Sequence, residues 1–146
     1  MKTQSAITVL LGLILLLVPG IPAAAQTEDP IDAVRKALSG QRLLVTYRDG
    51  GALYGTHYFL DVQLCRTGRY YTSAESRRTT ILNNQQVNRW RETGTWAIIS
   101  YENQPVLKYI SSAGKTNVAP ARLLPEGRIW LGEGVSVQRT GTTACR

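Results

Sequence analysis

Histidine and cysteine are scarce in this chain, and each scarcity excludes a class of site. His57 is the only histidine, so the sequence cannot supply a Ser-His-Asp triad or a cluster of histidine metal ligands. The two cysteines are far apart, which excludes a Cys-x-x-Cys zinc or redox motif. No glycine-rich phosphate loop precedes a helix, and no pair of carboxylates stands out as an acid/base couple. We therefore expect a protein that is not an enzyme and has no cofactor or metal.

Long apolar runs are also missing, apart from one at the N-terminus. Lys2 precedes an apolar stretch at residues 9–18, which is followed by two prolines and by Ala23-Ala24-Ala25. This order is typical of a secretory signal peptide cleaved after Ala25, and the apolar run is too short for a membrane span. The prediction is a signal peptide at residues 1–25, an N-terminal segment and helix at residues 26–39, and a β-barrel domain at residues 40–146. The mature protein is expected to be secreted or periplasmic.

The cysteine count agrees with export. An even number of cysteines in an exported chain predicts one disulfide, Cys65–Cys145. Such a bond joins the C-terminus to the middle of the domain, and loop-entropy arithmetic gives it about 4–5 kcal/mol of stabilisation.

Basic residues outnumber acidic residues. Basic residues number 17 against 10 acidic ones, for a formal net charge of +7, and thirteen of the basic residues are arginine. Arginine forms bidentate contacts with carboxylates and phosphates, so the composition suits an acidic protein or an anionic surface polymer as partner. The same composition also serves solubility alone. Nucleic acid is not the expected partner.

One helix is predicted, within residues 26–39. Asp29 suits the N-cap, Pro30 suits the first helical position, and Gly40 suits the end of the helix. The apolar residues of one helix face are Ile31, Val34 and Leu38. This short helix is marginal alone and must pack against the rest of the domain.

The remainder of the chain predicts short strands separated by tight turns. Apolar and polar residues alternate, turn residues recur at short intervals, and no second helical pattern is present. Strands are expected near residues 42–48, 57–64, 69–72, 96–99, 106–110, 117–124, 129–131 and 135–139. Consecutive hairpins favour an antiparallel up-and-down sheet of seven or eight strands that closes into a barrel, with a β-sandwich as the main alternative.

Several short motifs mark the predicted strand ends. They are Leu38-Ser39-Gly40, Leu64-Cys65 followed by Thr67-Gly68-Arg69-Tyr70, Gly94-Thr95-Trp96, and Gly127-Arg128-Ile129-Trp130-Leu131-Gly132. With these motifs the chain resembles small exported lipocalin-like (calycin-type) barrels, mostly of unknown role. The resemblance implies an all-β, up-and-down lipocalin-like barrel of seven or eight strands with one short N-terminal helix, exported by a bacterium. Lipocalins carry Gly-x-Trp on the first strand, whereas here it lies mid-chain, so the family's ligand transport is not carried over.

A looser resemblance concerns the start of the mature chain. Exported barrel inhibitors of bacterial metalloproteases insert an N-terminal segment into the protease cleft, and Gln26-Thr27-Glu28-Asp29 is similar in position. This resemblance implies a protease inhibitor.

The most unusual stretch is residues 76–92, where arginines bracket several apolar residues. Strand alternation looks weakest here, and Asn83-Asn84 can form a turn. An exposed basic and aromatic loop or hairpin suits a binding surface, because Arg and Trp often dominate interfaces. The predicted binding residues are Arg77, Arg78, Arg89, Trp90 and Arg91. The alternative is an ordinary long hairpin whose Trp90 folds back onto the barrel.

Aromatic residues at strand spacing leave two interpretations open. They either line a ligand cavity or fill the interior of a small barrel. The set is Tyr47, Tyr54, Tyr58, Trp96, Tyr109 and Trp130. His57 has the opposite parity on its strand and is expected on the polar face.

The function predicted from these features is a non-enzymatic exported binding domain that acts through loops or surface on a protein or an anionic polymer. One alternative is an inhibitor of an extracellular protease. Another is a carrier of a small apolar ligand, which requires an open, partly apolar cavity.

Overall fold

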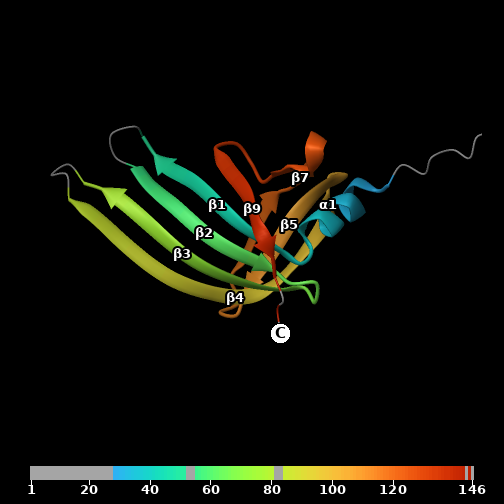
Figure 1. The fold of residues 1–146 in the computed structure, drawn as a ribbon, viewed down its shortest axis with the longest axis horizontal. Coiled ribbons are helices and arrows are strands. Elements are labelled where there is room, and N and C mark those ends of the chain that lie inside the picture. The colour runs from blue at the N-terminus through green and yellow to red at the C-terminus, as the bar shows by residue number, and fades with distance from the viewer. Residues whose placement is uncertain (1–27, 52–54, 81–83, 144, 146) are drawn as a thin grey trace, which may run out of the picture.

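The computed structural model describes residues 28–51, 55–80, 84–143 and 145. The predicted signal peptide and its cleavage site, Gln26, Thr27, Tyr54 and Asn83 lie outside these residues. The described chain forms one strongly curved antiparallel sheet with a short helix at one end (Figure 1).

The helix α1 (Pro30–Leu38) is confirmed where the sequence predicts it. The Asp29 carboxylate accepts a hydrogen bond from the amide of Ile31 at 2.9 Å, and Pro30 occupies the first turn. Gly40 takes a φ of +74°, which redirects the chain into the first strand. Val34 and Leu38 are buried against the sheet, so packing stabilises a helix that is too short to persist alone.

Seven strands form the main sheet, in the order β6-β5-β4-β3-β2-β1-β9, and every neighbouring pair is antiparallel. They are β1 (Gln41–Gly50), β2 (Gly55–Leu64), β3 (Arg69–Thr79), β4 (Gln85–Tyr101), β5 (Gln104–Ser111), β6 (Thr116–Pro120) and β9 (Val135–Thr142). A small hairpin of β7 (Arg122–Leu123) and β8 (Ile129–Trp130), joined by the 3-10 turn η1 (Pro125–Gly127), links β6 to β9. The up-and-down order is confirmed.

Three predicted strands have clearly different bounds in the structure. The expected strand at residues 96–99 is part of β4 (Gln85–Tyr101), whose first part pairs with β3. The expected strand at residues 69–72 continues to Thr79, because β3 pairs with β4 along its whole length, from Arg69–Thr95 to Thr79–Gln85. The expected strand at residues 117–124 is split at Ala121, which is fully buried between β6 and β7.

The sheet remains open along one side. Within the described residues, β6 and β9 are its two edges and no ladder joins them, so a closed barrel stays a prediction. The β7–β8 hairpin lies in this gap, with β8 beside β9. A single curved sheet, and not two stacked sheets, forms the wall of the domain (Figure 1).

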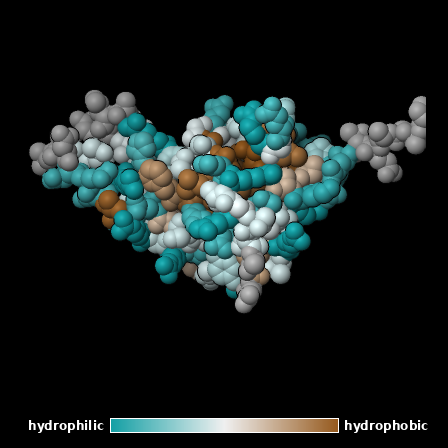
Figure 2. Space-filling view, viewed as in Figure 1, coloured by the Kyte–Doolittle hydropathy of each residue, from teal (hydrophilic) through white to brown (hydrophobic). Residues whose placement is uncertain are grey.

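The concave side of the sheet has two regions. In the packed end, α1 lies against β4, β5 and β7, and the side chains between them form the core. The core residues include Val34, Leu38, Leu43, Trp96, Ile98, Leu107, Ala121 and Ile129. In the open end, the far halves of β1 to β4 extend beyond the helix, with Tyr47, Tyr58 and Trp90 on the concave side. Figure 2 shows apolar side chains in the hollow between the strand tips and the packed end.

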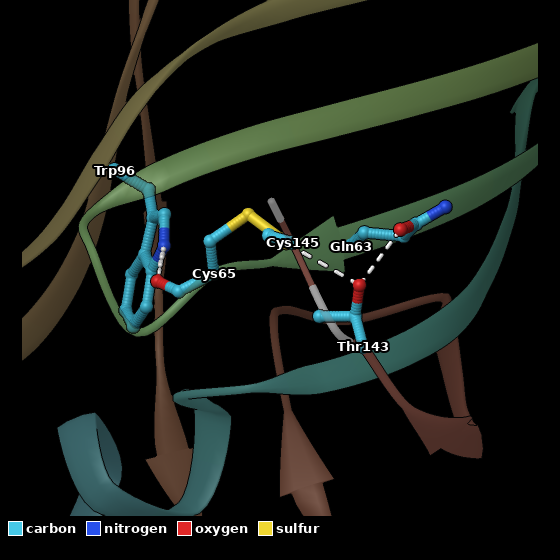
Figure 3. The surroundings of a disulfide bond; sticks show 5 residues. All are labelled: Gln63, Cys65, Trp96, Thr143 and Cys145. Atoms are coloured by element: carbon cyan, nitrogen blue, oxygen red, sulfur yellow. Dashed lines mark hydrogen bonds between the residues drawn. A yellow bond between two sulfur atoms is a disulfide. The ribbon is translucent and has the colours of Figure 1, made fainter.

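The predicted Cys65–Cys145 disulfide is present in the packed end, with a Cα–Cα distance of 5.5 Å. It ties the chain end to the turn between β2 and β3 (Figure 3). Beside it, the indole N–H of Trp96 donates to the carbonyl of Cys65 at 2.9 Å, and the hydroxyl of Thr143 lies 2.7 Å from Oε1 of Gln63. These contacts make the disulfide part of the core, since Cys65 is only 1% exposed.

No helix in the described part of the chain is long and apolar enough to cross a membrane.

Candidate ligand-binding groove

A groove of about 400 Å³ lies on the concave face where the open end meets the packed end. Alternation along the strands supplies its lining, because every second side chain faces the concave side. The apolar part includes Val45, Leu60, Val62, Leu107, Ala119 and Val135. The sheet therefore presents a mostly apolar surface that α1 does not cover.

Aromatic side chains border the groove toward the open end. Tyr47 and Tyr58, which are directly opposite on β1 and β2, stack with their ring centroids 4.6 Å apart. The edge of Trp90 meets Tyr58 at 6.5 Å. Offset and edge-to-face contacts of this kind stabilise aromatic pairs beyond their burial. The three rings form a wall that is anchored on three different strands.

A polar cluster of Tyr70, Glu92 and Tyr109 interrupts the apolar lining. The hydroxyl of Tyr70 donates to Oε1 of Glu92 at 2.5 Å, and the rings of Tyr70 and Tyr109 meet edge to face at 5.9 Å. Burial, helped by the Glu92 carboxylate, raises the pKa of Tyr70 and of Tyr109 above the ordinary tyrosine value. Both phenols therefore stay protonated at neutral pH, and Glu92 is the acceptor in the cluster.

Gly94 makes this cluster possible. It lies opposite Tyr70 in the ladder, and a Cβ at this position would come within 2.7 Å of the Tyr70 ring and 2.0 Å of the Ile110 carbonyl oxygen. Without a side chain there, the Tyr70 ring lies across β4 and reaches both Glu92 and Tyr109. The Gly-Thr-Trp motif thus supplies both a gap in β4 and the buried Trp96.

The structure divides the five predicted binding residues between the two faces. The described part of residues 76–92 is a regular antiparallel ladder of β3 and β4, so alternate side chains face opposite sides. Three of the five lie on the convex face, namely Arg77, Arg89 and Arg91. Arg78 and Trp90 have the opposite parity, and Trp90 folds back onto the concave face beside Tyr58. The alternative of a long hairpin with an inward Trp90 describes this segment, and the five residues do not form one surface.

Glu75 organises the convex arginines. It pairs with the Nε atoms of both Arg77 and Arg89, the latter at 2.7 Å, and these two hydrogen bonds lower the pKa of its carboxyl group. The Arg77 guanidinium also lies 4.9 Å from the centre of the Phe59 ring. On the neighbouring strands Arg42 forms a two-pronged pair with Asp61. The convex face is thus basic overall, with its two carboxylates already engaged.

The predicted aromatic set also divides. Trp96 is 7% exposed and fills the core, whereas Tyr47 and Tyr109 line the groove and Tyr58 stacks beside it. Trp130 is half-buried and packs under the guanidinium of Arg122 at 4.9 Å. His57 is exposed on the convex face, as its parity predicts. Trp96 is therefore core filler, whereas Tyr47 and Tyr109 line a groove on the concave face.

Sequence reasoning missed Tyr70 and Glu92 as site residues. Glu92 shares the inward parity of Trp90, Trp96 and Ile98 on β4. That parity was the available signal. Among the described residues, no group of three His, Cys, Asp or Glu side chains is arranged to hold a metal ion.

Comparison with known proteins gives no family assignment. No protein-family model, curated protein sequence or solved structure matches the chain. The geometry of the groove and of the convex face therefore carries the functional argument.

Proposed function

We propose that this protein is an exported, non-enzymatic binding protein that holds a small, largely apolar ligand in the groove. The observation that carries the proposal is the groove itself: about 400 Å³ of open, mostly apolar space bordered by aromatic rings and a few polar groups. Pockets of about 300–1,000 Å³ with this mixture are typical of small-molecule sites. A ligand there would cover apolar surface that the protein leaves in contact with water.

The fold supports this proposal because side chains fill the concave side of the sheet at one end only. A small eight-stranded barrel is just wide enough to be filled by its own side chains or to hold one small ligand. Here α1 and the β7–β8 hairpin fill only one end of the curved sheet. The proposal treats the domain as a lipocalin-like barrel that is incompletely closed, with the ligand in the unfilled end. The disulfide supports export, since such bonds persist in oxidising compartments.

The test uses two adjacent residues of β6. Ala119 lines the groove, whereas Val118 is 63% exposed and has the opposite parity. The purified chain is titrated with a naphthylamine dye that fluoresces in apolar surroundings. We expect saturable dye binding, its loss in Ala119→Trp, which fills the groove, and its retention in Val118→Trp. Absence of saturable binding by the unmodified chain, or equal binding by both variants, would contradict the proposal.

A second function is favoured by the convex face. We propose that an anionic surface polymer binds there, through Arg77, Arg89 and Arg91. Glu75 holds the first two by their Nε atoms, Arg89 remains 75% exposed at its side chain, and the neighbouring arginines share one face. Guanidinium groups fixed in this way lose less side-chain freedom when they bind an anion.

Retention on a heparin column tests this second function. Arg89→Gln should elute at lower salt than the unmodified chain, because binding through arginines weakens with ionic strength. Arg78→Gln removes the same charge from the opposite face and is the matched control. Equal loss in the control would show only a dependence on net charge.

A further inference from the structure

Glu92 is an anomaly within the groove. Its carboxylate lies in a groove that is mostly apolar and aromatic, and its one hydrogen-bond donor among the described residues is the Tyr70 hydroxyl. The salt bridges of the described residues do not include Glu92. Other half-buried carboxylates in the sheet, Asp61 and Glu75, each have arginine partners. A carboxylate removed from water without a cation is costly, so Glu92 has a charge that a ligand can compensate.

The surroundings of Glu92 are suited to a cation on an apolar ligand. Tyr70 donates to one of its oxygens, the Tyr109 ring meets Tyr70 edge to face, and Trp90 lies two residues earlier on the same face of β4. Aromatic faces attract ammonium groups, and a carboxylate among several aromatic rings is a recurrent way to bind them. The apolar strands β1 and β2 continue from this cluster and can cover a hydrocarbon chain.

We propose that the groove selects amphiphiles with an ammonium head, which Glu92 binds while the apolar chain lies along β1 and β2. This inference rests on the proposed function of the groove and names its ligand class. Lys115 is the one basic residue that lines the groove, and its side chain is exposed. Water therefore screens Lys115 more strongly than the half-buried Glu92, so the carboxylate dominates the field at the head.

The experiment compares three ligands that share one decyl chain: decyltrimethylammonium, decanol and decyl sulfate. Each displaces the naphthylamine dye from the unmodified chain below its micelle concentration. We expect the ammonium compound to bind about tenfold more tightly than decanol, and the sulfate to bind more weakly than decanol. In Glu92→Gln the preference for the ammonium compound should fall to within about twofold of decanol, while decanol binding stays the same. Glu75→Gln, on the convex face, is the matched control and should keep the preference.

The outcomes separate this inference from the proposed function. If none of the three ligands displaces the dye and the dye itself does not bind, the groove is not a ligand site and both fail. If decanol binds as tightly as the ammonium compound, or if the sulfate binds most tightly, the groove binds apolar chains but the ammonium inference is wrong. If Glu92→Gln does not fold, the ranking of the three ligands in the unmodified chain still decides whether the groove prefers the ammonium compound. A preference that survives in folded Glu92→Gln overturns the role given to Glu92.

Discussion

The packed end and the open end of the curved sheet are built from the same strands but differ in what lies on them. In the packed end α1 and the β7–β8 hairpin cover the concave face, and a disulfide holds the nearby turn. In the open end no described helix covers that face, and aromatic rings border a groove. The comparison shows that the sheet alone does not decide whether its concave side becomes a core or a site. The elements that cover the concave side of the sheet decide whether it becomes core or groove.

The strand β4 shows the difference within one element. It is 17 residues long and contributes Trp96 to the packed end and Trp90 to the open end, both with inward parity. Trp96 is 7% exposed and its indole N–H is hydrogen-bonded, whereas Trp90 is 38% exposed and meets a single ring edge to face. The same residue type thus serves as a structural support at one end and as a wall of the groove at the other.

The largest expected effect is on the packed end. Trp96→Ala should lower the free energy of unfolding by about 3–5 kcal/mol, because it empties a core position and removes one of the two donors to the Cys65 carbonyl, the other being the Gly68 amide. Trp90→Ala should cost about 1 kcal/mol, since its side chain is only partly buried. Urea unfolding of the two variants measures the contrast. Similar losses would show that the open end is as tightly packed as the core.

Removal of the disulfide should follow in size. The double variant Cys65→Ala with Cys145→Ala should lose about 2–5 kcal/mol, since the bond closes a long loop. Hydrogen exchange should show the added opening mainly in β9 and in the turn at residues 65–68, with less change at the tips of β3 and β4. Uniform loss of protection over the whole sheet would mean that the two ends unfold together.

A smaller effect is expected in the groove. Tyr70→Phe removes the hydroxyl that donates to Glu92 and should cost about 1–2 kcal/mol, because the carboxylate loses its one donor among the described residues. Thermal unfolding measures the change. Tyr71→Phe, on the next residue and the opposite face, is the matched control and should be nearly neutral. An unchanged melting temperature in Tyr70→Phe would show that water replaces the hydroxyl without cost.

High pH should act on the same cluster. The pKa values of Tyr70, Tyr109 and Tyr47 are raised in the folded protein, chiefly by burial, so unfolded tyrosines lose their protons first. The contribution of these residues to stability is fully present below the ordinary tyrosine pKa of about 10 and is lost as pH rises toward the raised values. Phenolate absorbance followed with pH should show a late fraction that disappears on unfolding. If every tyrosine titrates near the ordinary value in the native protein, the groove is more open to water than the structure shows.

The smallest effect is expected on the convex face. The Arg42–Asp61 pair is largely open to solvent, so breaking it with Arg42→Gln should change the free energy of unfolding very little. The pair lowers the pKa of Asp61, so its contribution is present above the ordinary carboxyl pKa and fades as pH falls through the lowered value. A double-mutant cycle with Asp61→Asn measures the coupling, which added salt should reduce. A coupling that is large and insensitive to salt would place this pair in a drier setting than the convex face provides.

Local signals in the sequence predicted much of the packed end. The N-cap at Asp29, the helix face of Val34 and Leu38, the inward Trp96 and the Cys65–Cys145 bond are all confirmed. Each depends on short-range chemistry: a cap, a helical period, a strand parity, an even cysteine count. The up-and-down strand order follows from consecutive hairpins in the same way.

The candidate site was harder to predict, because the groove exists only where no described helix or hairpin covers the concave face of the sheet. Residues 76–92 have few apolar side chains, so their alternation looked weak, and the regular β3–β4 ladder that they form is set by pairing between strands. Because alternate side chains of β4 face opposite sides, Trp90 faces the concave side, whereas Arg89 and Arg91 face the convex side. The Tyr70–Glu92 contact joins two strands across Gly94, and no local pattern reports such a contact. The openness of the sheet depends on where the β7–β8 hairpin lies, which is a tertiary property.

The pairing of β1 with β9 has a consequence for how the chain is made. These strands come from the two ends of the domain, with Val45 opposite Val137. When the chain is synthesised or exported with its N-terminus first, one edge of β1 stays unpaired until almost the whole domain has emerged. That unpaired edge includes the apolar residues Leu43 and Val45, so a second emerging chain can pair with it. Formation of this late ladder pairs that edge of β1 and also brings Cys145 to Cys65.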